Sequence, residues 1–202
     1  MSNFVYYYKL VTLLVLLIIF GTPNVWSDGP YLNGQILVAT TRMNDPRFIQ
    51  TIIYMIKHNK EGAMGLVINR PLASGPITDL LKSFGLESNN ASGEITIHYG
   101  GPVQQSKVFV LHSSEYAVAG TIALQGGVAL TGNPEVLQAI ANDNGPSQNL
   151  LIVGYAGWGP DQLEGEIKAN HWFTIPAEKE LIFDKQTETK WEKARAKQKI
   201  AL

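Results

Sequence analysis

Five side chains in this sequence could bind a ligand or take part in catalysis: His58, Asn69, Arg70, His112 and Trp158. The two histidines end β-rich segments, where an imidazole could serve as a base or as a ligand. Arg70 follows an apolar segment and Asn69, so its guanidinium could form paired hydrogen bonds with a carboxylate or phosphate. Trp158 could anchor a partner through its large amphipathic ring. These five residues are therefore our candidate binding residues.

Each candidate also has a purely structural explanation. A histidine at the end of a strand commonly forms hydrogen bonds within a turn. Arg70 could form an internal ion pair with Asp45 or Glu164, and isolated arginines often fix loops in this way. Trp158 could pack against Leu163 across the start of a helix. We therefore assign no catalytic residue.

The signatures of several enzyme and metal-site classes are absent from the sequence. It contains no G-x-S-x-G, H-E-x-x-H, G-x-x-x-x-G-K-[ST] or G-x-G-x-x-G motif, and it has no cysteine. His58, His98 and His112 are scattered without helical spacing, whereas a zinc site needs three or four well-placed ligands. We therefore expect neither a metal nor a cofactor, and we favour a protein that is not an enzyme.

The distribution of charge bears on the class of partner. The 16 basic and 17 acidic residues give a net charge of −1. Residues 28–187 carry −5, whereas residues 188–202 carry +3. Binding to nucleic acid without sequence preference depends on clustered lysine and arginine side chains. The acidic body therefore argues against nucleic acid as a partner.

The first 27 residues resemble a secretory signal peptide. Lys9 precedes an apolar run at 10–20, and the small residues Val25 and Ser27 suit a signal peptidase. The run is too short to span a membrane of about 30 Å comfortably. We therefore expect residues 1–27 to be a removable leader and the protein to be exported to the periplasm or cell envelope.

A wrongly assigned start codon is the alternative explanation of this leader. Translation that begins near Tyr31 would give a cytoplasmic protein and would leave the rest of the chain intact. If the leader is retained instead, contact with a membrane would be confined to residues 4–20. In each case residues 28–202 read as a single domain, because no linker, repeat or low-complexity run divides them.

The remaining chain alternates short β-rich runs with amphipathic helices. The expected strands lie at 36–40, 51–57, 64–69, 95–99, 107–112, 150–155, 171–175 and 181–183, with a further pair within 120–130. The second and third strands are spaced as an antiparallel hairpin. The expected helical segments are a single turn at 44–48, a helix at 77–84 ended by Gly85, a helix at 133–142, a helix carrying Leu163 and Ile167, and a basic helix that begins at Trp191. We expect Trp191 to dock on the domain while 193–199 stay solvated.

Several blocks of sequence resemble the YqgE/AlgH family. They extend over roughly residues 34–195, which is most of the chain, and their order and spacing agree with the family. The blocks are Ala39-Thr40, Met43-Asn44-Asp45-Pro46-Arg47-Phe48, Tyr54, His58, Gly62-Ala63-Met64-Gly65, Ile68-Asn69-Arg70-Pro71, Gly100-Gly101-Pro102-Val103, Phe109-Val110-Leu111-His112, Gly154-Tyr155-Ala156-Gly157-Trp158, Gln162-Leu163-Glu164 and Asn170. The chain departs from the family pattern at Thr41, where proline is common, and at Asp161, where glycine is common.

The resemblance implies a fold and very little chemistry. It implies an α+β domain with a mostly antiparallel, bifurcated sheet that curls into a partly open, barrel-like core with helices packed outside. Members are described as transcriptional regulators or left uncharacterised, and the family supplies no catalytic residue to transfer to this chain. Most relatives begin close to the first strand and look cytosolic, in contrast to the leader of this chain.

Three hypotheses for the function follow. The leading hypothesis is a non-enzymatic binding or regulatory domain that recognises a protein or a small anionic ligand. The first alternative is a small hydrolase-like enzyme in which His58, His112 and Arg70 converge at one end of the barrel. The second alternative is a DNA-binding transcriptional regulator. Convergence of the three side chains around one pocket would favour the enzyme.

Overall fold

The computed structural model describes residues 31–87 and 91–198, and the expected leader at 1–27 lies outside them. Its strands are β1 (Gln35–Ala39), β2 (Ile52–Asn59), β3 (Gly62–Val67), β4 (Pro71–Pro76), β5 (Glu94–Tyr99), β6 (Val103–Ser113), β7 (Ile122–Leu124), β8 (Val128–Thr131), β9 (Asn149–Trp158) and β10 (Trp172–Pro176). Its helices are α1 (Ile77–Ser83), α2 (Glu135–Ala141), α3 (Gln162–Lys168), α4 (Lys179–Ile182) and α5 (Lys190–Gln198), with a 3-10 turn, η1 (Gln125–Gly127). Over the described ranges, no helix is long and apolar enough to cross a membrane.

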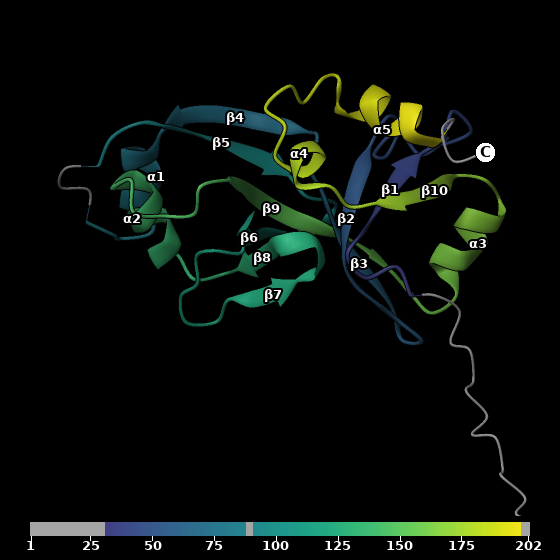
Figure 1. The fold of residues 1–202 in the computed structure, drawn as a ribbon, viewed down its shortest axis with the longest axis horizontal. Coiled ribbons are helices and arrows are strands. Elements are labelled where there is room, and N and C mark those ends of the chain that lie inside the picture. Colours follow the sequence, from purple (N-terminus) through teal and green to yellow (C-terminus); the bar gives the residue numbers. More distant parts are fainter. Residues whose placement is uncertain (1–30, 88–90, 199–202) are drawn as a thin grey trace, which may run out of the picture. The chain divides into compact units, whose positions relative to one another are not determined.

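The strands form one ten-stranded sheet in the order β10-β1-β2-β3-β9-β6-β8-β7, in which neighbouring strands are antiparallel. β4 and β5 form an antiparallel pair beside this path, and β5 runs parallel to β9. The predicted hairpin is β2–β3, and the pair predicted within 120–130 is β7–β8. Figure 1 shows the sheet curling between the α1–α2 end of the domain and the α3 end.

The sheet divides along β9. The C-terminal half of β9 pairs with β3, where Gly65 lies opposite Ala156, while the N-terminal half pairs with β5. Two backbones approach closely at this division, because a Cβ added at Gly100 would lie 2.2 Å from the carbonyl oxygen of Gly154. Gly154 has a φ of 73°, a left-handed conformation that glycine adopts without steric cost. The predicted bifurcated sheet is thus confirmed.

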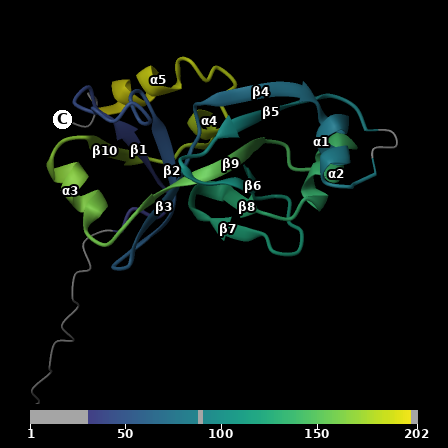
Figure 2. The same cartoon turned by 180° about the vertical axis from the view of Figure 1, so that it is seen from behind.

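The helices cover the sheet at three places, and each place has its own cluster of buried apolar side chains. α1 and α2 pack on each other at one end of the domain (Figure 1), and α3 packs against β3 and β10 at the opposite end. α4 and α5 lie together, and α5 also packs on β1, β2 and β10, as the reverse view in Figure 2 shows. An α+β fold with helices outside a half-barrel sheet is therefore confirmed.

Two elements differ from the sequence-based expectations. The prediction of a strand at 181–183 is wrong, because Lys179–Ile182 form the short helix α4. Its three consecutive apolar residues fit either a buried strand or one buried helical turn. β4 was not predicted, since it contains two prolines and largely exposed side chains. Among the described strands it pairs only with β5, and at such an edge the missing N–H of proline costs no ladder hydrogen bond.

Candidate functional site

The five candidate residues lie in separate parts of the domain. His58 is near the end of β2, whereas Asn69 and Arg70 follow β3 at the opposite end of the same hairpin. The eight residues of β2 separate these two ends by roughly 23 Å. Trp158 is at the end of β9, in line with His58 but on the other side of β3, because both pair with Ala63. His58 and Trp158 therefore lie at the same end of the sheet without contacting each other, and Arg70 lies far from both.

His58 is buried, and both of its ring nitrogens are engaged. The backbone N–H of Leu32 donates to Nδ1 at 3.1 Å, so the ring proton of this tautomer is on Nε2. Nε2 then donates to the Glu164 carboxylate at 2.8 Å. The edge of the ring packs against Tyr31. No nitrogen of His58 remains for a ligand, so this histidine fixes α3 and the chain before β1.

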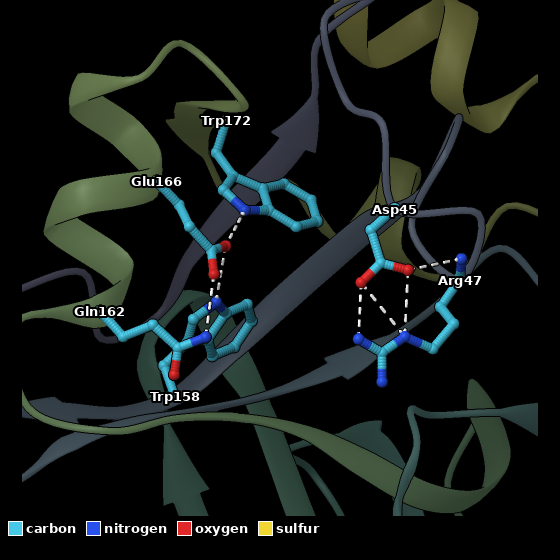
Figure 3. A network of polar contacts seen from close by, with 6 residues as sticks. All are labelled: Asp45, Arg47, Trp158, Gln162, Glu166 and Trp172. Atoms are coloured by element: carbon cyan, nitrogen blue, oxygen red, sulfur yellow. Dashed lines mark hydrogen bonds and ion pairs between the residues drawn. The ribbon is translucent and has the colours of Figure 1, made fainter.

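Trp158 belongs to a second saturated group on α3. Its Nε1 donates to Glu166 Oε2 at 3.0 Å, and Nε1 of Trp172 donates to the same oxygen at 2.7 Å. Gln162 donates to the other oxygen of Glu166 at 3.0 Å. Figure 3 shows the two indoles approaching Glu166 from two strands, with their rings packed edge to face. One carboxylate thus joins β9, β10 and α3, and packing of Trp158 in one cluster with Leu163 agrees with its structural explanation.

Asn69 and Arg70 bind the turn before β2. The side-chain oxygen Oδ1 of Asn69 accepts from the backbone N–H of Ile52 at 3.0 Å, and its side-chain Nδ2 donates to Gln50 O at 2.9 Å. Arg70 Nη2 donates to Ile49 O at 2.7 Å. These contacts hold a turn in which Gln50 has a φ of 54°. The two side chains therefore stabilise this turn.

The expected ion pairs of Arg70 are not present. Asp45 binds Arg47 instead, through three side-chain hydrogen bonds of 2.6–3.1 Å (Figure 3). These bonds hold the pKa of the Asp45 carboxyl below its ordinary value. Glu164 binds His58. The interpretation of Arg70 as the ion-pair partner of Asp45 or Glu164 is therefore wrong, and its observed partner is a backbone carbonyl.

His112 is fully buried in β6. Its Nδ1 donates to the carbonyl oxygen of Ser113 at 3.0 Å, and its ring packs edge-on to Tyr116. Nε2 has no hydrogen-bond partner in the described part of the chain. His112 therefore shares no polar contact with His58 or Arg70, and the convergence that a hydrolase would need is not found.

A large cleft lies elsewhere in the described part of the chain and was not anticipated from the sequence. It is a cleft of about 630 Å³ between the β4–β5 pair, the residues that lead into β9 and the segment after α4. This volume is within the range of small-molecule sites. The lining residues are Pro71, Ser74, Glu94, Ile95, Thr96, His98, Ile140, Ser147, Gln148, Asn149, Leu150, Phe183, Asp184, Lys185, Thr187 and Glu188. We refer to it as the β5–β9 cleft.

His98 forms part of the wall of the β5–β9 cleft and is only 5% exposed. Its Nδ1 lies 3.3 Å from the carbonyl oxygen of Leu151, which can only accept, so Nδ1 carries the proton. Burial lowers the pKa of His98 and the charge of Lys190 lowers it further, while hydrogen bonds to the backbone of Leu151 and Thr96 partly offset both effects. The ring is therefore neutral at pH 7, with Nε2 as a hydrogen-bond acceptor.

Lys190 is fully buried, and its charge acts on His98. Its ammonium donates to the carbonyl oxygens of Ile68 at 2.9 Å and Ile182 at 2.7 Å. Burial lowers the pKa of Lys190 to about 8. The next residue, Trp191, is 7% exposed and donates from Nε1 to Ala39 O at 2.8 Å, so the predicted docking of Trp191 is confirmed. The prediction that 193–199 stay solvated is wrong at Ala194, which is fully buried in the same core cluster. Lys190 and Trp191 fasten the C-terminal wall of the cleft to the sheet.

Carboxylates line the rim of the β5–β9 cleft. Asp184 accepts from Lys193 at 2.6 Å and from the backbone of Gln186 at 2.8 Å, and the bond to Lys193 lowers the pKa of Asp184 most. Glu94 and Glu188 have no ion-pair partner within residues 31–87 and 91–198. The carboxylates of Glu94 and Glu188 are therefore available to bind a ligand in the cleft.

Sequence reasoning missed the two buried basic groups at this cleft. His98 was considered only as a member of a scattered histidine set, and Lys190 was counted within the basic tail. Alternation within β5 places His98 on the same face as Thr96, which also lines the cleft, and this period was the available signal. No group of three potential metal ligands occurs among the residues that the structure describes.

Comparisons of sequence and of structure with known proteins find the same group of relatives. The sequence model of a family described as AlgH-like matches residues 36–202. A UPF0301 protein of Methylococcus capsulatus is 46% identical over 172 residues, which cover 85% of this chain and 94% of the relative. A UPF0301 protein of Rhodospirillum rubrum is 42% identical over 161 residues, covering 80% and 84%. The solution structure of the AlgH protein from Pseudomonas aeruginosa matches with a TM-score of 0.69 and 39% identity, covering 83% of this chain and 89% of that one.

Proposed function

The chain belongs to the AlgH-like family, whose function is uncharacterised, and from this premise we propose a non-enzymatic binding domain whose ligand site is the β5–β9 cleft. One observation carries the proposal: a neutral, largely buried imidazole, His98, forms the wall of a cleft of about 630 Å³. A concave site with a few fixed polar groups is the usual form of a small-molecule site. The ligand is a small molecule that can donate hydrogen bonds.

The contacts of the cleft support binding over catalysis. The hydroxyls of Ser74 and Thr96 lie 2.8 Å apart and bond to each other rather than to His98. Nδ1 of His98 faces the backbone carbonyl of Leu151 and not a carboxylate. A nucleophilic site would instead need a hydroxyl bonded to a base that a third group orients. His98 is therefore placed to accept a hydrogen bond from a ligand.

The anionic ligand expected from Arg70 would bind at a neighbouring hollow of about 220 Å³. Arg70 and Asn69 line this hollow, but so do Glu188 and Glu192, which would repel an anion. The negative charges of Glu188 and Glu192 disfavour binding of an anion in this hollow. The guanidinium of Arg70 also already donates to the backbone carbonyl of Ile49. We therefore place the ligand in the β5–β9 cleft and not at Arg70.

The DNA-binding alternative would use the basic tail. Three of its lysines are already engaged: Lys190 is buried, Lys193 binds Asp184, and Lys197 binds Glu178 at 2.6 Å. We therefore do not adopt this alternative. Titration of labelled duplex DNA against salt tests the choice, and tight binding at low salt with a steep salt dependence would restore it.

The cleft proposal is tested by screening small fragments against the ¹⁵N-labelled protein. The fragments include cationic, neutral and anionic compounds. We expect a subset to shift the amide signals of Thr96, Asn149 and Thr187, and His98→Gln to weaken their binding. His58→Gln is the matched control, because His58 is an equally buried histidine at the other end of the domain. If every binding fragment shifts signals outside the cleft, or none binds, the proposal is wrong.

We propose in addition that the protein acts in the periplasm or cell envelope, with the cytoplasm as the alternative. The proposal is based on the apolar run at 10–20 and the small residues Val25 and Ser27. Mass spectrometry of the native N-terminus decides between the two. A chain that begins at Asp28 in an envelope fraction supports export. A chain that begins near Tyr31 in the cytosol excludes it.

A further inference from the structure

Building on the proposed function of the β5–β9 cleft, we infer that its ligand is a small organic cation with an aliphatic stem, such as a diamine. Three independent features of the cleft lead to this class: the balance of charge on its rim, the acceptor nitrogen of His98 in its wall, and the apolar side chains between them. In this assignment, one ammonium group of the ligand binds among Glu94, Glu188 and His98, which all line the cleft.

The charged side chains that line the cleft are mostly acidic. Glu94, Asp184 and Glu188 face it, against the single ammonium of Lys185. Lys193 neutralises Asp184 from outside the cleft lining. Both Glu94 and Glu188 line the cleft, one from β5 and the other from the segment before α5. A cation between them would interact with two carboxylates that have no ion-pair partner in the described ranges.

His98 is the second observation. It is only 5% exposed, and the polar contacts found for its ring are with the backbone of Leu151 and Thr96 and with no side chain of the described residues. Nε2 of the neutral ring is a lone-pair acceptor, and a ligand N–H is the complementary group. An anion would meet this lone pair and the rim carboxylates together. His98 and the rim carboxylates therefore disfavour anionic ligands and favour ligands that donate N–H hydrogen bonds.

Lys190 is the positive charge that opposes this assignment, because it is close enough to affect His98. Two of its N–H groups are directed to the carbonyls of Ile68 and Ile182, so they do not point toward a ligand. Burial lowers the pKa of His98 most, and the charge of Lys190 lowers it further. Lys190 thus preserves the acceptor that the ligand uses, at the expense of some repulsion.

The apolar part of the lining suits an aliphatic stem. Ile95, Leu150 and Phe183 contribute to the same cleft as the carboxylates. Methylene groups bury favourably against such side chains, while the terminal ammonium groups remain at the rim. A chain of four carbons is far smaller than the cleft volume of about 630 Å³. Longer amines would therefore also fit.

Three probes with the same four-carbon stem test the inference: 1,4-diaminobutane, 1,4-butanediol and succinate. Each is titrated into the ¹⁵N-labelled protein at pH 7.5 and low salt. We expect only the diamine to shift the cleft amides of Thr96, Asn149 and Thr187 with a measurable Kd. Its affinity should fall by about threefold or more between 20 and 200 mM salt, because exposed charges are screened.

Charge-neutral variants assign the ammonium site. The double variant Glu94→Gln/Glu188→Gln should weaken diamine binding by about three- to thirtyfold, since it removes two exposed carboxylates that would pair with the ammonium group. Glu61→Gln/Glu87→Gln makes the same change in net charge away from the cleft and should leave Kd within about twofold. Equal losses in both double variants would mean that the diamine responds only to net charge, and would overturn the inference.

The outcomes separate the ligand class from the cleft itself. If succinate or butanediol shifts the cleft amides at least as strongly as the diamine, the cation assignment is wrong and the proposed ligand site stands. If the diamine fails to bind while other fragments bind the cleft, the assignment is wrong as well. If neither these probes nor the fragment screen affects the cleft, both the assignment and the proposed function fail.

Discussion

The α3 end of the domain and the β5–β9 cleft contain the same kinds of residue in opposite states. At the α3 end, His58 uses both ring nitrogens, and the carboxylate of Glu166 accepts three hydrogen bonds. At the cleft, the ring of His98 has polar contacts only with the backbone, and Glu94 and Glu188 have no ion-pair partner, within the described chain. The α3 end is a closed network, and the cleft is an open one.

The difference shows why residue type alone is a weak guide to a functional site. A histidine beside a glutamate suggests chemistry, yet His58 and Glu164 join α3 to the sheet. The more informative property is hydrogen-bonding capacity that the protein leaves unused at a concave surface. By that criterion the cleft is the better candidate, although none of its charged residues stood out in the sequence.

The two regions also differ in how they are held. α3 is fixed to two strands through Glu166, whereas the C-terminal wall of the cleft is fixed by Lys190 and Trp191. Loss of the Glu166 contacts should therefore destabilise the α3 end, and loss of the Lys190 or Trp191 contacts should destabilise the cleft wall. The following predictions test this contrast.

The largest effect is expected at the cleft wall. Trp191→Ala should lower the free energy of unfolding by about 3–5 kcal/mol, because it empties a buried site and leaves the Ala39 carbonyl without its donor. Urea denaturation measures the loss. Arg195→Ala is the control, since it removes only the cation over the Trp191 ring, at 4.6 Å, and should cost about 1 kcal/mol or less. Similar losses in both variants would argue against docking through the indole.

The next effect is expected at the α3 end. Glu166→Ala should lower the free energy of unfolding by about 2–4 kcal/mol, because two largely buried indole N–H groups lose their acceptor. Glu166→Gln keeps an acceptor oxygen and should cost about 1 kcal/mol. Both variants should leave fragment binding at the cleft unchanged, which NMR titration checks. Loss of cleft binding in these variants would show that the two regions are one unit.

Buried Lys190 gives the cleft wall a characteristic pH dependence. Its pKa is about 8 in the folded protein, below its ordinary value of 10.5, so the unfolded chain binds this proton more tightly. Stability from this group therefore rises as pH increases from about 8 toward 10.5. Between pH 7.5 and 9.5 we expect a gain of about 1–2 kcal/mol, measured by urea denaturation at each pH.

Lys190→Met is the control for this pH dependence, because it retains the bulk of the stem and removes the titrating group. The variant should lack the gain, even though it is less stable through the unpaired carbonyls of Ile68 and Ile182. Tyr54 does not interfere in this window, since burial raises its pKa to about 12 and its effect begins only above pH 10. An identical pH profile in both proteins would exclude Lys190 as the source.

Most of the fold could be predicted from the sequence because its signals are local. Two β-rich runs separated by a short polar turn predicted β2 and β3, and the helical spacing of Ile77, Leu81 and their neighbours predicted α1. β4 could not be predicted, because it is a strand only through its pairing with β5, and α4 was misassigned because three apolar residues have no resolvable period.

The cleft could not be predicted for a different physical reason. Its walls come from three segments that are distant in sequence, and their approach depends on the division of the sheet at β9. Lys190 illustrates the problem. In the sequence it is one of several basic residues in a tail, and only tertiary packing shows that its ammonium binds two backbone carbonyls.

The smallest predicted effect is a gain of stability at the start of α3. Asp161 has a φ of 59°, in the left-handed region, and its side chain makes no capping hydrogen bond there. Glycine, which is common at this position in the family that the sequence resembles, adopts this conformation without a Cβ clash. Asp161→Gly should raise the free energy of unfolding by about 0.5 kcal/mol, because relief of backbone strain slightly exceeds the extra entropy of the unfolded chain.

Asp161→Ala is the matched control and should lower stability, since alanine keeps the Cβ and lacks the tolerance of aspartate for this region. Chemical denaturation of the three proteins under one condition measures the order, which we expect to be glycine, aspartate, alanine. An alanine variant as stable as the glycine variant would mean that the left-handed turn is not strained, and that α3 is held entirely by its side-chain network.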